Sequence, residues 1–171
     1  MSHKLTLAQI NALDAAAFIR QLGGIFEHSP WVAERAQARR PFATVDAMHA
    51  AMVAEVEFAG HEMQLTLIRA HPELAGKAAI RGEMTEESNR EQSGAGLNLC
   101  SPQEFAKLQS LNASYNQKFG FPFIVAVRGH TRHSIIALFE QRLGNAPEVE
   151  MRECLQQIYR ISRFRLEDMI A

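Results

Sequence analysis

Apolar residues in this chain recur at intervals of three and four, the spacing of one buried face of an α-helix. The clearest case begins at Ser101, which can cap a helix, with Pro102 suited to the first turn and Glu104 completing a capping box. Gly120 ends the run, and the residues that follow at helical spacing are Phe105, Leu108, Leu111, Asn112 and Tyr115. The sequence therefore predicts a long helix between Ser101 and Gly120.

The same start and stop signals occur along the rest of the chain. Thr44 and Thr85 are suited to cap helices, and glycines follow several periodic stretches, as at Gly23-Gly24 and Gly60. Further helices are expected over 7–22, 44–60, 62–70, 131–143 and 147–170. Internal repeats and linkers are missing from the sequence. We expect an all-α protein of about seven or eight helices, built as a single compact domain over residues 1–171.

One stretch breaks the helical pattern. Phe121 to Val127 is short, apolar and rich in β-branched residues, and it is bounded by glycine and proline. Its length would suit a buried strand, but the sequence offers no second strand nearby to pair with it. We therefore expect an extended, buried segment.

The charge balance excludes several classes of protein. The chain carries 18 basic and 19 acidic residues, so it lacks the excess positive charge of a nucleic-acid binder. Cys100 and Cys154 are far apart and indicate neither a disulfide framework nor a zinc ribbon. The sequence contains no apolar run that could cross a membrane and no signal peptide, so a cytoplasmic location is expected.

Histidines raise the question of a metal site. His130 and His133 form an H-x-x-H, and His61 is followed by a glutamate, but neither matches the H-E-x-x-H of zinc helices. The simpler interpretation is that His130 and His133 are ordinary polar residues at the start of a helix. No metal is expected.

A more informative group combines His71 with a short helix that Thr85 can cap. His71 precedes a proline, which disfavours helix at that position and indicates that His71 lies at a helix end. Ser88, Glu91 and Gln92 fall at i, i+3 and i+4, so their side chains share one face. A carboxylate beside an imidazole orients the ring and favours its protonated form, which can then donate a proton. The alternative is that this polar face is only solvated.

Two arginines stand in the apolar C-terminal helix. Arg163 and Arg165 could both extend to the surface, which is the commoner arrangement. Alternatively, one of them could point inward and hold an anionic substrate through a bidentate contact.

At these residues the chain resembles, from end to end, the OHCU decarboxylases, which act on 2-oxo-4-hydroxy-4-carboxy-5-ureidoimidazoline in the urate-to-allantoin pathway. The resemblance rests on several long blocks in the same order. These blocks are Phe26–Val32, His71–Lys77, Ser88–Leu97, Tyr115 with Lys118–Phe123, and Arg165-Leu166.

The resemblance implies an all-helical, cofactor-free enzyme that releases carbon dioxide and forms (S)-allantoin. It implies that His71 donates the proton, that Glu91 orients His71, and that Arg165 rather than Arg163 holds a substrate anion. It further implies substrate contacts from Pro72, Ser88, Glu91 and Gln92, and from the main chain of Phe123, Ile124, Val125, Ala126 and Val127. A homodimer is an expectation from the same resemblance. The alternatives are a non-enzymatic helical adaptor and a metal-dependent hydrolase.

Overall fold

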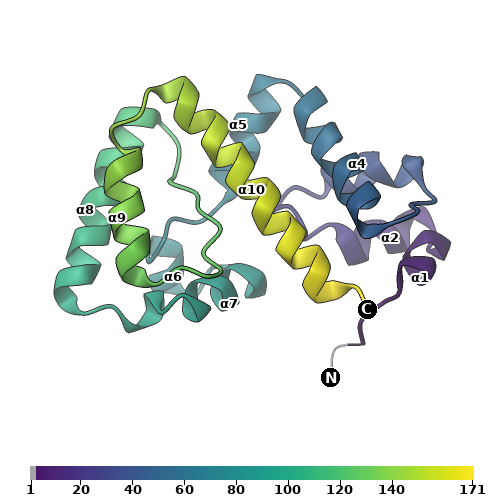
Figure 1. The fold of residues 1–171 in the computed structure, drawn as a ribbon, viewed down its shortest axis with the longest axis horizontal. Helices are drawn as coiled ribbons and strands as arrows, with labels where there is room; N and C mark the ends of the chain where they lie inside the picture. Colours follow the sequence, from purple (N-terminus) through teal and green to yellow (C-terminus); the bar gives the residue numbers. More distant parts are fainter. Residues whose placement is uncertain (1–2) are drawn as a thin grey trace. The chain divides into compact units, whose positions relative to one another are not determined.

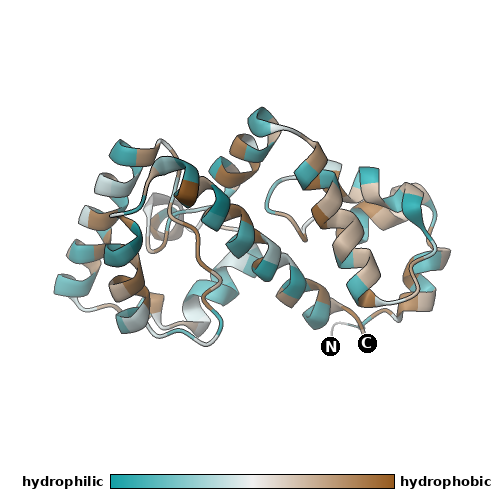
Figure 2. Cartoon of the chain, turned by 45° about the horizontal axis from the view of Figure 1, so that its top comes forward, coloured by the Kyte–Doolittle hydropathy of each residue, from teal (hydrophilic) through white to brown (hydrophobic). Residues whose placement is uncertain are grey.

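The computed structural model describes residues 3–171, with only the backbone of Lys77 and Ala78, and it is built from α-helices (Figure 1). No strand occurs among these residues; the single β-bridge joins Leu5 and Ile170. The all-α fold predicted from the sequence is confirmed. Most helices carry both hydrophilic and hydrophobic residues (Figure 2), as expected for helices with one buried face. None of the described helices is long and apolar enough to span a membrane.

The described residues group into two compact units, one formed by the chain up to Ala70 and from Ile158 onward, the other by His71–Gln157. The first unit contains five helices and the C-terminal part of α10. The helices are α1 (Leu7–Ala12), α2 (Ala15–Leu22), α3 (Trp31–Ala36), α4 (Val45–Phe58) and α5 (His61–Ala70), with a 3₁₀ turn at Gln37–Arg39. Its core contains Phe18, Met48, Met52, Leu67 and Ile68, which are fully buried.

The second unit contains four helices and the N-terminal part of α10 (Pro147–Met169). The four are α6 (Lys77–Arg81), α7 (Glu86–Gly94), α8 (Pro102–Phe119) and α9 (Arg132–Arg142), with a 3₁₀ turn at Leu97–Leu99. Helices α8 and α9 lie side by side (Figure 1). Between them the chain runs through the non-helical residues 121–127, and the aromatic rings of Tyr115, Phe123 and Phe139 pack together.

Capping explains where these helices begin. Ser101 accepts from the Glu104 N–H at 3.1 Å while the Glu104 carboxylate accepts from the Ser101 N–H at 3.0 Å, so the predicted capping box of α8 is confirmed. Thr44 and Thr85 cap α4 and α7 as predicted. Gly120 ends α8 in the left-handed conformation, with φ at 77°, which glycine adopts without strain.

The structure differs from the prediction at the N-terminus. The sequence pattern indicated one helix up to Gly23, but the chain forms two, because Asp14 accepts from the Ala17 N–H at 2.7 Å and starts α2. The short helices α3 and α6 raise the total in the described residues to ten α-helices, above the seven or eight expected.

Candidate active site

His71 lies directly after the last residue of α5 and is buried, with 8% of its surface exposed. The predicted position at a helix end is confirmed. Pro72 follows and disfavours a helical conformation at His71, so the chain leaves the helix axis there. A histidine in this place is held by the backbone on one side and by a loop, Pro72–Gly76, on the other.

The loop after His71 has an unusual backbone. Ala75 has φ at 49°, a left-handed conformation that side chains other than glycine seldom adopt. At Gly76 a side chain is excluded, because a Cβ atom would lie 2.7 Å from the Cβ of Glu73. Such a conformation persists only when the surrounding structure holds it in place.

Three amide side chains on one face of α8 hold this loop, and we call Gln109, Asn112 and Asn116 the α8 amide row. Gln109 donates to the Ala75 carbonyl at 2.8 Å, and Asn112 donates to the Leu74 carbonyl at 3.0 Å. Asn116 donates to the Glu73 carboxylate. Because the positions 109, 112 and 116 follow the helical repeat, one rigid helix fixes three successive residues of the loop.

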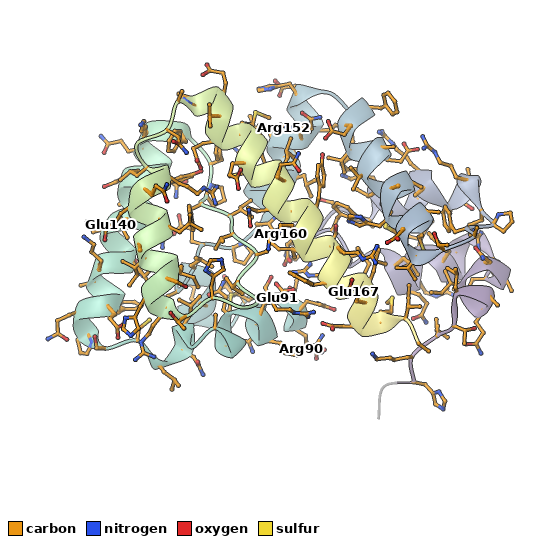
Figure 3. All side chains as sticks on the ribbon, in the orientation of Figure 1. Arg90, Glu91, Glu140, Arg152, Arg160 and Glu167 are labelled. Carbon is orange, nitrogen blue, oxygen red and sulfur yellow. The ribbon has the colours of Figure 1, made fainter. Side chains whose placement is uncertain are left out.

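The short helix α7 supplies the predicted polar trio. Ser88 and Gln92 are buried, while Glu91, on the same helix, is half-buried (Glu91 is labelled in Figure 3). Gln92 accepts from the Ala75 N–H at 2.9 Å and donates to the Glu73 carbonyl at 3.2 Å. The structure thus brings Gln92 to the loop after His71 as a support of its backbone. The pairing of Glu91 with His71 stays a prediction, as do the substrate contacts of Pro72, Ser88, Glu91 and Gln92.

A cavity of about 400 Å³ lies beside α7, between α6, the 3₁₀ turn and the start of α8. Of the residues predicted to bind substrate, Gln92 lines it. The other lining side chains are mainly apolar, including Ile80, Met84, Leu97 and Phe105.

Residues 121–127 are buried throughout, and the predicted extended, buried segment is confirmed. Two of its backbone groups have partners from neighbouring helices: the Ile124 carbonyl accepts from Arg142, and the Ala126 N–H donates to Gln157 at 2.9 Å. Within residues 3–171, the N–H groups of Phe121, Phe123, Ile124, Val125 and Val127 donate no hydrogen bond. Buried backbone N–H groups without a partner are rare, which makes these donors candidates for binding a ligand.

Arg142 is itself fixed by a buried ion pair with Glu150, at 2.9 Å between Nη2 and Oε2. Tyr115 also donates to Glu150, and Asn145 donates to it at 2.8 Å. Burial, the largest single effect, would lower the pKa of Arg142, but its hydrogen bonds to Glu150 and the charges of neighbouring acidic groups together raise the pKa. Burial raises the pKa of the neighbouring Tyr115 and Cys154, so both stay protonated.

The two C-terminal arginines differ in burial. Arg165 is 6% exposed and donates to Glu27 at 2.8 Å and to the Gly24 carbonyl at 3.2 Å. Arg163 is partly exposed and pairs with Glu167 and Asp46 on the surface. Burial is therefore consistent with the preference for Arg165. Its contact with a substrate stays a prediction.

In the part of the chain that the structure describes, no three histidine, cysteine or acidic side chains gather as metal ligands would. His130 hydrogen-bonds Ser134 at 3.0 Å, and His133 lies 3.5 Å from Glu104. Both flank Thr131, the cap of α9, in agreement with their interpretation as polar residues at a helix start.

Sequence reasoning missed several residues that build this site. Asn112 shares its helical spacing with apolar residues, and an amide at such a position is itself a signal of a specific hydrogen bond. Gln109, Asn116, Arg142 and Gln157 gave no signal, because their partners lie far away in sequence.

Comparison with known proteins adds a family relationship. The family described as OHCU decarboxylase matches residues 11–167. A 2-oxo-4-hydroxy-4-carboxy-5-ureidoimidazoline decarboxylase of Haloferax volcanii is 43% identical over 166 residues, which is 97% of this chain and 96% of the relative. A uric acid degradation bifunctional protein of Bacillus subtilis is 42% identical, but this chain covers only 33% of it. The solved structure of an (S)-allantoin synthase superposes with a TM-score of 0.78 at 30% identity, covering 98% of this chain and 54% of that one.

Proposed function

The chain belongs to the OHCU decarboxylase family, a family of carboxy-lyases in urate degradation, and we propose that His71 delivers the proton that completes its reaction. The enzyme decarboxylates 2-oxo-4-hydroxy-4-carboxy-5-ureidoimidazoline. The near full-length match to decarboxylases decides against the helical adaptor and the metal-dependent hydrolase. We further propose that the product is (S)-allantoin.

The observation that carries the assignment of His71 is its fixed position. The imidazole lies at the end of α5, buried, and the loop behind it is hydrogen-bonded by Gln92 and by the α8 amide row. A proton donor must be held in one place if it is to reach one face of a substrate carbon. Glu91 is proposed to orient the imidazole.

The chemistry needs a proton at a defined carbon. The bond between the carboxylate and the hydroxyl-bearing ring carbon breaks, and its electron pair moves into the ring as carbon dioxide leaves. The ring nitrogen that gains the negative charge takes up a proton. The hydroxyl then loses its proton as it becomes a carbonyl, and a proton is added to the neighbouring carbon that carries the ureido group. Delivery by His71 from one side would produce a single enantiomer.

The N–H groups of residues 121–127 that donate no hydrogen bond within the described chain suit the negative charge that develops in this reaction. We propose that the main chain of Phe123 to Val127 binds oxygen atoms of the substrate ring, with Phe123 and Val125 as donors. Such donors accelerate the reaction only if they bind the developing anion more strongly than the substrate. The apolar side chains around them exclude water from the scissile carboxylate.

Polar contacts to the remaining substrate groups are assigned to Pro72, Ser88, Glu91 and Gln92, with Arg165 on an anionic group. An arginine suits this role because its guanidinium forms two parallel hydrogen bonds with a carboxylate. Arg165 is already oriented by Glu27, so its geometry is set before any substrate arrives.

His71→Asn tests the proton donor. The substrate is generated from urate with uricase and hydroxyisourate hydrolase, and its decay and the chirality of the allantoin are followed by circular dichroism. We expect the variant to fold and to lose about 10²–10⁴-fold in kcat, the range for general acid catalysis. His133→Asn, at an exposed histidine, should retain full activity. A folded His71→Asn enzyme with wild-type kcat would sink the assignment.

Location and assembly are proposals too. We propose a cytoplasmic enzyme, supported by two cysteines that are both free thiols. We also propose a homodimer, which light scattering of the purified protein would test directly.

A further inference from the structure

The backbone N–H and C=O groups of the buried segment 121–127 need hydrogen-bond partners inside the protein. Irregular segments normally run over the surface, because buried N–H and C=O groups need partners. This one is buried at every residue, with Phe123 and Ala126 each only 1% exposed. The positions of its hydrogen-bond partners therefore show which edge of the segment is held by the protein and which edge is left for a ligand.

Its partners lie on one edge. The Ile124 carbonyl and the Ala126 N–H are bound by Arg142 and Gln157. In an extended chain these two groups point to the same side, and the N–H groups of residues 123, 125 and 127 point to the other. Phe123 and Val125 thus present their N–H groups, about 6.6 Å apart along the segment, away from Arg142 and Gln157.

Arg142 and Gln157 are held more firmly than a surface side chain would be. Arg142 is buried against Glu150, and its guanidinium also lies over the Phe123 ring, 4.4 Å from the ring centre. Gln157 is 7% exposed, and its amide nitrogen donates to Glu153 at 2.8 Å. Both side chains therefore have one group on the segment and another anchored to a helix.

We propose that Arg142 and Gln157 are positioning residues: by holding the Ile124 carbonyl and the Ala126 N–H, they aim the Phe123 and Val125 N–H groups at the substrate. This inference rests on the proposed function, in which residues 123–127 bind the substrate. Neither side chain needs to touch the substrate to affect the reaction.

The test begins with Gln157→Met, which keeps the length of the side chain but removes the acceptor for Ala126. We expect kcat to fall about 10-fold while KM changes by less than about 3-fold, because the donors act on the transition state. Gln156→Met, at the exposed neighbouring position of α10, is the matched control and should leave both constants unchanged. If Gln157→Met does not fold, Gln157→Asn, whose amide is one methylene too short, should show the same drop in kcat.

Exchanging the side chains of positions 153 and 157 should restore the activity that Gln157→Met loses. Glu153→Gln combined with Gln157→Glu restores an acceptor for the Ala126 N–H and keeps the hydrogen bond between positions 153 and 157. We expect this double variant to recover kcat to within about 3-fold of wild type. A purely structural role for Gln157 would lower thermal stability without this split between kcat and KM.

Amide chemical shifts separate this inference from the proposed function. Titrating (S)-allantoin into the wild-type enzyme should shift the backbone amides of Phe123 and Val125 more than that of Ala126. If those two amides do not respond, residues 123–127 do not bind the ligand, and both proposals fall. If they respond but Gln157→Met keeps wild-type kcat, only the positioning role is overturned.

Discussion

His49 lies half-buried on α4, where its Nε2 atom is 2.9 Å from the Tyr159 carbonyl and 3.0 Å from the Ser162 hydroxyl. Burial lowers the pKa of His49 from its usual 6.5, and nearby Arg163 lowers it further, against the opposing effects of the Tyr159 carbonyl, Asp46 and Glu167. Folding therefore favours the neutral imidazole.

This sets a pH dependence of stability. Below pH 6.5 the unfolded chain binds a proton at His49 that the folded protein does not bind, so the free energy of unfolding falls as the pH decreases. We expect His49→Gln, which keeps a nitrogen near the Tyr159 carbonyl but does not titrate, to reduce this decrease in urea unfolding between pH 7 and 5. His133→Gln, at an exposed histidine, should leave it unchanged. Equal pH dependence in wild type and His49→Gln would contradict the assignment.

The buried ion pair of Glu27 and Arg165 is expected to contribute to the free energy of unfolding. Glu27 is 1% exposed, and removing its charge leaves the Arg165 guanidinium buried without that carboxylate. We expect Glu27→Gln to lower the free energy of unfolding in urea by about 3 kcal/mol. Glu167→Gln breaks the exposed pair with Arg163 and should cost no more than about 0.5 kcal/mol. Similar losses for both variants would mean that burial does not strengthen the inner pair.

Among the helices, α8 connects capping, packing and the site. Its start is fixed by the capping box at Ser101, its end by Gly120, and between them its amide row holds the loop after His71. The Oδ1 atom of Asn112 is buried and has no hydrogen-bond partner among the described residues. The Asn112 side chain therefore makes one hydrogen bond, to the Leu74 carbonyl, and leaves its own oxygen without a donor, which is unfavourable in the protein interior.

Asn112→Leu removes both the bond and the unsatisfied oxygen. We expect stability to change by only about 1 kcal/mol, because the loss and the gain partly cancel. In contrast, kcat should fall on the order of 10-fold, because the loop that carries His71 is less firmly held. Gln117→Leu, at an exposed position of the same helix, is the control for the substitution itself. An Asn112→Leu enzyme with kcat within twofold of wild type would show that the amide row is only structural.

The helices also show how far sequence reasoning reaches. Capping signals are local, so Ser101, Thr44 and Thr85 were predicted correctly from a few neighbouring letters. The break between α1 and α2 was missed, because the apolar spacing continues across Asp14.

The candidate site shows the same limit. His71 at a helix end and the buried segment 121–127 followed from proline and from the apolar pattern. The side chains that hold them, such as Asn112 and Gln157, act over 38 and 31 residues of sequence, and no local pattern announces such a contact.

At the scale of the whole molecule, helix α10 belongs to both compact units. Helix α10 contributes Glu150 and Gln157 to one unit and Ser162 and Arg165 to the other. Gln157, which binds the buried segment, and the buried Arg165 thus lie on a single continuous helix.

The proposed chemistry also makes a statement about the purified enzyme as a whole. Since His71 is proposed to donate the proton and main-chain amides to bind the developing anion, we expect the rate of decarboxylation to be unchanged after dialysis against EDTA. Elemental analysis of the dialysed protein should accompany the assay, so that removal of metal is verified. Loss of activity that returns on adding back a divalent metal would contradict a cofactor-free mechanism.

The bridge between Leu5 and Ile170 joins the two ends of the described chain, and the Ala171 N–H donates to the Leu5 carbonyl at 2.9 Å. Residues 5–171 therefore form a nearly closed ring. A short linker could seal this ring, and new ends could then be opened in a surface turn such as the one at Gly144, giving a circular permutant with the same contacts. For the same reason, segments attached before Leu5 and after Ala171 would leave the described residues from neighbouring points.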